Sequence, residues 1–131
     1  MKGSDQKIQS FTQLIAWQKA HLLALEIYKI TKAFPMEEKF GLIDQLRRAA
    51  ISVTSNIAEG FYRRTMKDKA HFYAISLGSL AEIQNQLLMS RDLTYLQNEM
   101  FHSIAIKTVE VHKLLNGLIK SSRLRGVTPK Y

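Results

Sequence analysis

Apolar residues recur every three or four positions through most of this chain, a spacing that is typical of one face of an α-helix. Four such stretches follow one another, with polar or turn-forming residues between them. A period-two alternation of apolar and polar residues is absent, so no β-strand is expected. The pattern therefore predicts an all-α fold built from four helices.

The first predicted helix begins near Gln13 and ends before Pro35. Ser10 followed three residues later by Gln13 fits a capping box, and Thr12 is an alternative cap. The residue before a proline is driven out of the α region, so Phe34 closes the helix. Six apolar residues at helical spacing form its predicted buried face: Ala16, Ala20, Leu23, Ile27, Ile30 and Phe34.

The second and third helices have boundary signals of the same kind. Residues 36–38 bring two glutamates to the start of the second helix, where the helix dipole favours negative charge. Gly60 is the expected stop of that helix. Thr65 is the expected cap of the third helix, which ends near residues 91–92.

The fourth predicted helix has the most regular apolar repeat and runs from about Gln97 to residues 121–122. The predicted buried faces are Leu42, Leu46, Ala49 or Ala50, Val53 and Ile57 in the second helix; Phe72, Ile75, Ser79, Leu80, Ile83 and Leu87 in the third; and Phe101, Ile104, Thr108, Val111, Leu115 and Leu118 in the fourth.

Four helices of about 20–27 residues with short connections are expected to pack as an up-down-up-down antiparallel four-helix bundle. The 131 residues fit a single domain. We expect residues 1–10 to form a flexible N-terminus, residues 11–121 the bundle, and residues 122–131 a basic C-terminal tail.

The formal net charge of +8 is concentrated in two segments, residues 61–71 and 120–131. In the predicted topology the second helix ends, the third begins and the fourth ends on the same side, so both segments should meet there. Such clustering indicates an anionic partner, and the alternative is that both segments serve solubility. The basic residues that we expect to bind this partner are Arg63, Arg64, Lys67, Lys69, Lys120, Arg123 and Arg125.

The composition excludes several classes of protein. Without cysteine the chain can form neither disulfides nor thiolate metal sites. No apolar run approaches the ~18–20 residues of a membrane span, and no signal peptide opens the sequence, so a cytoplasmic protein without membrane contact is expected. Its glycines are isolated, so a phosphate-binding loop is not expected either.

Two short motifs suggest a metal site and are rejected on geometry. Glu99 and His102 form a Glu-x-x-His motif, and Asp68 with His71 is its aspartate analogue. Di-iron bundles use two such motifs that face each other. Here each motif lies in the first turns of its helix, and the two helices are antiparallel, so the histidines should lie at opposite ends. We expect no metal and no cofactor.

A polar group near the end of the second helix has two interpretations. Asn56 and Glu59 fit either a polar active centre or hydrogen bonds that close the helix, with Arg47, Arg48 or Arg63 as partners. The histidines have no serine, aspartate or cysteine at a recognisable catalytic spacing. We favour the structural interpretation and expect no catalytic residues.

Several segments together resemble the bacterial 23S rRNA intervening-sequence proteins, a family of four-helix bundles. The resemblance extends over about residues 11–120. It rests on Tyr28, Phe34 with Pro35, His71 with Phe72, and the segments 14–20 (LIAWQKA), 38–42 (EKFGL), 45–50 (QLRRAA), 55–60 (SNIAEG) and 78–82 (GSLAE).

This resemblance implies a fold and an assembly but transfers no catalytic residue. A related branch, the accessory proteins of diversity-generating retroelements, forms pentameric barrels with a basic surface that bind nucleic acid and a reverse transcriptase. It therefore implies a homopentamer for this chain.

Two functions remain open at this stage. One is a non-catalytic nucleic-acid-binding or accessory protein, supported by the clustered charge beside Phe61 and Tyr62. The alternative is a structural or adaptor oligomer that binds a protein partner such as a nucleic-acid enzyme. Its support is the set of apolar residues left on outer helix faces: Leu22, Leu25, Ile106 and Val109.

Overall fold

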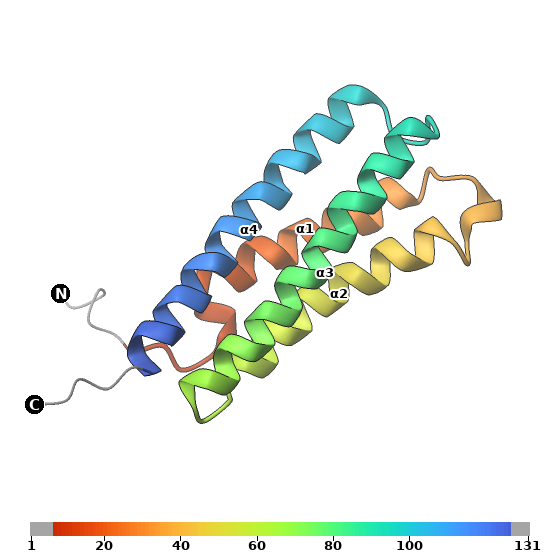
Figure 1. Ribbon diagram of the computed structural model, residues 1–131. Helices are drawn as coiled ribbons and strands as arrows, with labels where there is room; N and C mark the ends of the chain where they lie inside the picture. The colour runs from red at the N-terminus through yellow and green to blue at the C-terminus, as the bar shows by residue number, and fades with distance from the viewer. Residues whose placement is uncertain (1–6, 127–131) are drawn as a thin grey trace, which may run out of the picture.

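The structure, a computed structural model, describes residues 7–126 of the chain, with side chains as far as Arg123. Its elements are the helices α1 (Ile15–Thr31), α2 (Leu42–Phe61), α3 (Met66–Asp92) and α4 (Asn98–Gly126), and the short 3-10 turns η2 (Phe11–Gln13) and η3 (Met36–Glu38). Consecutive helices run in opposite directions (Figure 1), and these residues contain no strand. The predicted all-α fold with four helices is confirmed.

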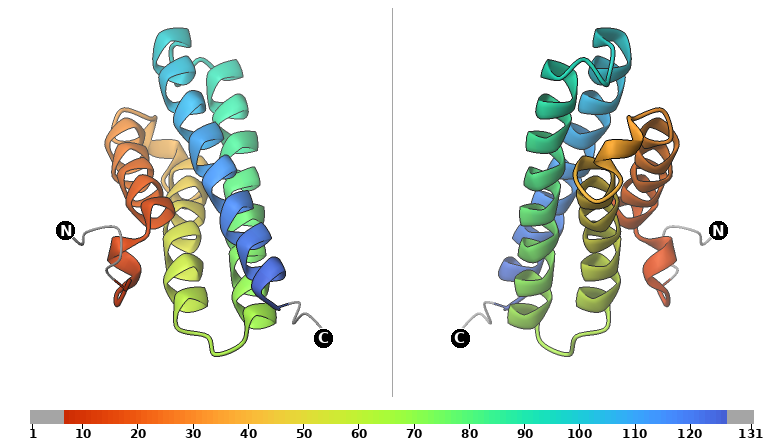
Figure 2. Two further views of the ribbon diagram at one scale, coloured as in Figure 1. Left: turned by 90° about the vertical axis from the view of Figure 1, so that its left-hand side faces the viewer. Right: turned by 90° about the vertical axis from the view of Figure 1, so that its right-hand side faces the viewer.

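The four helices differ in length. Helices α3 and α4 have 27 and 29 residues, whereas α1 and α2 have 17 and 20. At one end of the bundle the α3–α4 hairpin therefore projects past the connection between α1 and α2 (Figure 2).

The core is formed largely by the helix faces that the sequence predicts. All six positions predicted for the first helix are buried, although the last of them, Phe34, lies beyond the end of α1, and in α2 both Ala49 and Ala50 are buried. The most deeply enclosed side chains come from α1, α2, α3 and α4 alike and include Leu23, Ile27, Leu46, Ile57, Leu80, Ile83, Ile104 and Leu115.

The predicted face of α3 is wrong in its first turns. Tyr73 and Ser76 are buried there, whereas Ile75 is 39% exposed and Phe72 is half-buried. The Ser76 hydroxyl donates a hydrogen bond of 2.8 Å to a carbonyl of α2, which satisfies a polar group inside the core. From Leu80 onward the predicted face is correct.

Helix α4 is longer than predicted, because it continues to Gly126. Beyond Leu115 its buried face moves from Leu118, which is half-buried, to Ile119 and Ser122. A straight helix with 3.6 residues per turn drifts away from a seven-residue repeat, which explains this shift. The backbone of residues 122–126, the first half of the predicted basic tail, is thus helical. Residues 1–6 of the predicted flexible N-terminus and residues 127–131 of the predicted basic tail lie outside the described residues.

Helix α1 begins at Ile15, and the predicted capping box forms one turn earlier. The Ser10 side chain and Gln13 cap η2 reciprocally, as the sequence indicates, with Gln13 Oε1 accepting the Ser10 N–H at 3.1 Å. Leu14 then connects η2 to α1 in an extended conformation. The capping box is confirmed, but it starts the 3-10 turn rather than the α-helix.

Helix α1 ends at Thr31, ahead of the predicted Phe34. Arg47 of α2 donates from Nε to Thr31 Oγ1 at 2.9 Å and from Nη2 to the carbonyl of Tyr28 at 3.2 Å. The same guanidinium lies 4.6 Å from the centroid of the Tyr28 ring. Arg47 thus supplies hydrogen bonds to a hydroxyl and a carbonyl in the last turn of α1, where backbone carbonyls have no partner within the helix.

Helix α2 begins at Leu42 rather than at residues 36–38, which form η3. Glu38 still caps α2, because its Oε1 accepts the Leu42 N–H at 3.1 Å. Its Oε2 accepts a hydrogen bond of 3.0 Å from the Tyr95 hydroxyl, which links η3 to the α3–α4 connection. The predicted negative charge at the start of α2 is therefore present. It comes from the side chain of Glu38, which lies in η3 rather than in α2 itself.

Gly60 does not stop α2, contrary to the sequence prediction. Helix α2 continues through Phe61, and none of the described glycines has a positive φ. A Cβ atom at residue 60 would lie 2.8 Å from Tyr73 Cε1 and 3.0 Å from Phe72 Cβ. Glycine is needed at this position because α2 and α3 approach each other closely there.

Replacing Gly60 with alanine is expected to lower the free energy of unfolding by about 1–2 kcal/mol, because overpacking outweighs the better helix propensity of alanine. Gly117→Ala is the matched control, since a Cβ at that helical glycine would meet nothing within 4 Å. The control should stabilise by up to about 1 kcal/mol. Urea denaturation midpoints that move in the same direction for both variants would contradict the close-approach explanation.

Candidate nucleic-acid interface

The two basic segments lie at the same end of the bundle. Figure 2 shows the connection between α2 and α3 at the end where α4 finishes. Side chains from both regions, among them Phe61, Lys69 and Ser121, line a single cavity. The predicted convergence is confirmed. We call this end the basic end, defined by Arg63, Arg64, Lys67, Lys69, Lys120 and Arg123, and the opposite end the far end.

Arg63 is held within the fold. Its guanidinium forms an ion pair with Glu59, one turn earlier in α2, and lies 4.3 Å from the centroid of the Phe72 ring. The two charged side chains remain 41% and 53% exposed. Arg63 therefore presents an oriented but partly neutralised charge at the surface.

Lys69 also serves the fold. Its ammonium donates to the carbonyl of Phe61, at the end of α2, and at 3.4 Å to that of Gly60, which also accepts the Arg63 N–H at 3.2 Å. The ammonium also lies 5.4 Å from the centroid of the Phe61 ring. Burial lowers the pKa of Lys69 from its ordinary value. Lys69 thus caps the C-terminal end of α2 with two hydrogen bonds, and the third N–H of its ammonium remains for a group in the cavity.

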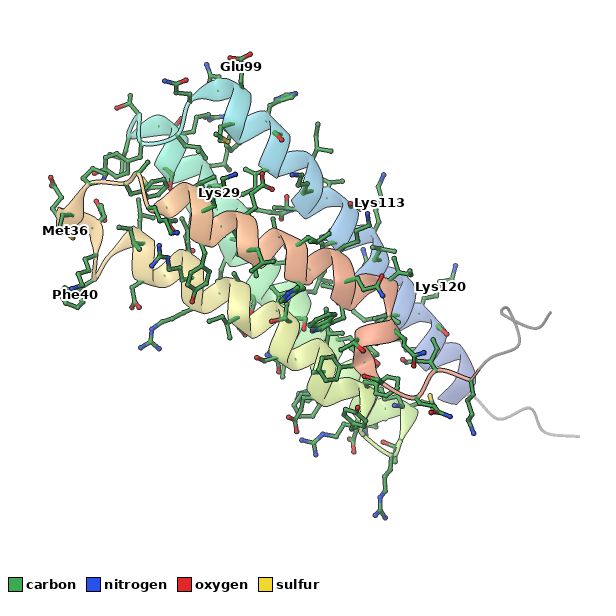
Figure 3. All side chains as sticks on the ribbon, turned by 180° about the vertical axis from the view of Figure 1, so that it is seen from behind. Lys29, Met36, Phe40, Glu99, Lys113 and Lys120 are labelled. Atoms are coloured by element: carbon green, nitrogen blue, oxygen red, sulfur yellow. The ribbon has the colours of Figure 1, made fainter. Side chains whose placement is uncertain are left out.

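The remaining described residues of the basic end are open to solvent. Arg64, Lys67, Lys120 and Arg123 are all exposed, and none forms an ion pair with another residue between 7 and 123. Lys120 points away from α4 in Figure 3. The side chain of Arg125 lies outside the described residues. These four cations are the ones best placed to meet an anionic polymer.

Exposed aromatic surface accompanies the charge. Tyr62 is 61% exposed, and its ring packs edge-on against Phe61 at 4.8 Å and Phe11 at 6.1 Å between centroids. Phe11 in turn packs edge-on against Trp17 at 5.2 Å. Helix η2 is thereby fastened to the basic end, with the Tyr62 ring at its outer edge.

Lys7 belongs to this site and was not predicted from the sequence. Lys7 lines the same cavity as Lys69 and Ser121, although it lies far from both in the sequence. Lys7 stands in a polar N-terminal stretch that also contains Lys2 and Asp5, so no local pattern could have placed it at the basic end.

The polar group at the end of α2 has the structural role that we favoured. Asn56 Nδ2 donates to the carbonyl and the hydroxyl of Ser52, at 2.9 and 3.1 Å, and Glu59 pairs with Arg63. Arg48 pairs instead with Asp44, at 3.1 Å. Of the three arginine partners left open, Arg63 is therefore the one that Glu59 uses.

The candidate metal motifs are separated as predicted. Helix α3 begins at the basic end and α4 begins at the far end (Figure 1), so His71 and His102 lie at opposite ends of the bundle. Within residues 7–123, no group of three or more His, Asp or Glu side chains is arranged to hold a metal ion.

Outer faces of α1 and α4 carry the exposed apolar side chains that the sequence indicated. Leu22 is 59% exposed and Leu25 55%, and both line a groove of about 400 Å³ between the two helices. Ile106 and Val109 on α4 are 62% and 46% exposed. Two ion pairs join α1 to α4 beside the groove, Lys19–Glu110 at 3.7 Å and Lys107–Glu26 at 2.8 Å.

Fold and surface together define a small four-helix protein with one strongly basic end. None of the helices within residues 7–126 is long and apolar enough to span a membrane. The chain belongs to the family of 23S rRNA-intervening sequence proteins, whose family model matches residues 12–117. The resemblance seen in the sequence is thereby confirmed.

A solved structure supports this assignment. The chain is similar to a protein of unknown function from the S23 ribosomal protein family of Bacteroides thetaiotaomicron VPI-5482, with a TM-score of 0.73 and 25% sequence identity. The similarity covers 81% of this chain and 99% of that one. A comparison with curated proteins found no match.

Proposed function

We propose that this protein binds RNA or DNA through its basic end and catalyses no reaction. The observation that carries the proposal is the convergence of cations from two distant segments, with Arg64, Lys67, Lys120 and Arg123 exposed and without acidic partners among the described residues. Lysine and arginine contacts to phosphate position a nucleic acid without reading its sequence. Binding is therefore expected to be insensitive to sequence.

The aromatic surface favours a single strand over a duplex. An exposed ring such as Tyr62 can stack on an unpaired base, whereas the bases of a duplex are already stacked on one another. Single-stranded RNA or DNA, or the loops of a folded RNA, are thus the preferred partners in this proposal.

A binding panel tests the function directly. Single- and double-stranded RNA and DNA of equal length are titrated in gel-shift assays at 50 and 200 mM salt. If about six or more phosphates are contacted, affinity should fall by about a thousandfold between the two salt concentrations. Absence of binding to every member of the panel at 50 mM salt would refute the proposal.

We also propose that the protein is a cyclic homo-oligomer, with five subunits as the family resemblance implies. The exposed apolar side chains on α1 and α4 support a contact with further copies, because burying them removes apolar surface from water. A ring of this kind would present several basic ends on one side and multiply the attraction for a long polyanion.

Light scattering at micromolar concentration should give a mass about five times the 15.0 kDa of one chain. Leu22→Glu combined with Leu25→Glu should lower that mass, because charge in an apolar interface is unfavourable. Phe40→Glu is the matched control, since Phe40 is 85% exposed and lies at the far end. A mass near 15.0 kDa for the wild type would contradict the oligomer.

The second candidate function is an adaptor that binds a protein partner. The exposed residues Ile106 and Val109 favour it, because they offer apolar surface away from the basic end. A purified protein with no bound nucleic acid by its 260/280 nm absorbance ratio, no binding in the panel, and a specific protein captured in pull-downs would replace the first proposal with this one.

A further inference from the structure

The basic end contains a cavity whose chemistry goes beyond a phosphate-binding surface. Its volume is about 390 Å³, and it lies between the N-terminal segment, the start of α3 and the last turns of α4. Phe61, Met66 and Leu118 supply apolar walls, while Lys69, Tyr73 and Ser121 supply polar groups. Cavities that hold small organic groups start at about 300 Å³ and combine apolar walls with a few polar groups in this way.

Tyr73 is the residue that marks this cavity as a binding site. It is 3% exposed and lines the cavity, and its hydroxyl makes no hydrogen bond to any residue between 7 and 123. The hydroxyl oxygen is not among the fully enclosed side-chain atoms without a partner in this part of the chain, so it opens into the cavity and is free to bond a ligand there. Burial raises the pKa of Tyr73, so the hydroxyl stays protonated and can both donate and accept a hydrogen bond.

The cations around the cavity favour a ligand group that is attached to phosphates. Lys7 and Lys69 line it, and Arg64, Lys67, Lys120 and Arg123 surround the same end of the bundle. Lys69 already donates to two backbone carbonyls, so its ammonium is fixed in position rather than mobile. A group with an apolar face, a polar edge and a phosphate on each side matches this combination.

We infer that the cavity holds one unpaired nucleobase of a bound single strand. The inference rests on the proposed nucleic-acid binding and adds a base-dependent step to it. Phosphates on either side of the base lie against the exposed cations, while the base enters between Phe61 and Leu118 with Tyr73 at its polar edge. A paired base in a duplex is excluded, because it has no route out of the stack without breaking its pair.

The test separates bases from phosphates. A single strand of about ten thymidines is compared with a strand of the same length made of abasic sugars, which carries the same charge. The wild type should bind the thymidine strand about tenfold more tightly at equal salt, the effect of one well-held base. Thymidine monophosphate serves as a competitor, and it should displace the strand only at far higher concentration, because it lacks the flanking phosphates.

Ser121→Phe fills the cavity without changing charge. It should weaken binding of the thymidine strand about tenfold and leave binding of the abasic strand unaffected. Asn116→Phe is the control, because it adds the same ring to an exposed position of α4 that does not line the cavity. Tyr73→Phe, which keeps the ring and removes only the hydroxyl, should weaken the thymidine strand several-fold without lowering thermal stability.

The outcomes distinguish this inference from the function on which it rests. Equal affinity of the wild type for the thymidine and abasic strands overturns the base cavity and leaves phosphate binding standing. Failure to bind either strand at 50 mM salt overturns both. Equal weakening by Ser121→Phe and Asn116→Phe, or displacement of the strand by thymidine monophosphate at the concentration of the strand itself, also overturns the base cavity.

Discussion

Replacing both Arg64 and Lys67 with glutamate is expected to weaken nucleic-acid binding by about a hundredfold or more at 0.1 M salt. Each phosphate contact releases roughly one counterion, which is worth about tenfold in affinity at this salt concentration. Two contacts are lost, and two new negative charges repel the phosphates. The loss should be the same for every sequence, and the slope of log affinity against log salt should become shallower by about two.

The fold should tolerate this double charge reversal. Both side chains are exposed and form no ion pair among the described residues, and a glutamate at residue 67 lies in the first turn of α3, where negative charge is favourable. Arg63 is left unchanged because a glutamate there would face Glu59 and lose the contact with Phe72. A change at Arg63 would therefore mix an effect on folding with an effect on binding.

Lys32→Glu combined with Lys39→Glu is the matched control. Both lysines are exposed near the α1–α2 connection at the far end, so the net charge changes by the same amount away from the proposed interface. This control should lose far less affinity than the double variant at the basic end. An equal loss in the two variants would mean that net charge alone drives binding, and intact binding by the double variant at the basic end would refute the assigned interface.

Leu115→Ala is expected to lower the free energy of unfolding by about 2–5 kcal/mol, the largest effect on stability among these predictions. Leu115 is 0% exposed and projects from α4 into the apolar core of the bundle. Truncation removes its transfer free energy and leaves a cavity that the surrounding helices fill only in part. The urea midpoint should fall while the dependence of stability on urea stays unchanged.

Met100→Ala on the same helix provides the comparison for Leu115→Ala. Met100 is 47% exposed, so its truncation should change stability by no more than about 0.5 kcal/mol. A midpoint that barely moves for Leu115→Ala would show that the buried register of α4 is wrong.

Helix faces were predictable where one apolar repeat keeps helical spacing along the whole helix. In α1 and α4 such a repeat marks the buried face, even though further apolar residues lie on the outer faces, and the exception is the drift to Ile119 at the end of α4. Helix α3 carries apolar residues on two neighbouring sides. The choice of Tyr73 and Ser76 over Phe72 and Ile75 depends on the close approach at Gly60, which is a tertiary contact without a local signal.

The position of the basic end was predictable, but the individual roles of its residues were not. Topology alone places residues 61–71 beside the end of α4, because each helix reverses the chain. The sequence cannot show that Lys69 closes α2 or that Arg63 pairs with Glu59, since both contacts depend on side-chain geometry. Nor can it show that Tyr73 lines a cavity, because the apolar pattern places Phe72 rather than Tyr73 on the buried face.

A bundle with an even number of antiparallel helices returns the chain to the side from which it started, and Lys7 and the last turns of α4 accordingly meet at the basic end. An affinity tag or fluorescent protein fused to either terminus would therefore sit beside the proposed interface and interfere with it. Phe40 offers a better attachment point, because it is 85% exposed and separated from the basic end by the length of α2, roughly 30 Å. Since the chain has no cysteine, Phe40→Cys would introduce a single thiol. A maleimide dye on that thiol would report on binding from a site far from the proposed interface.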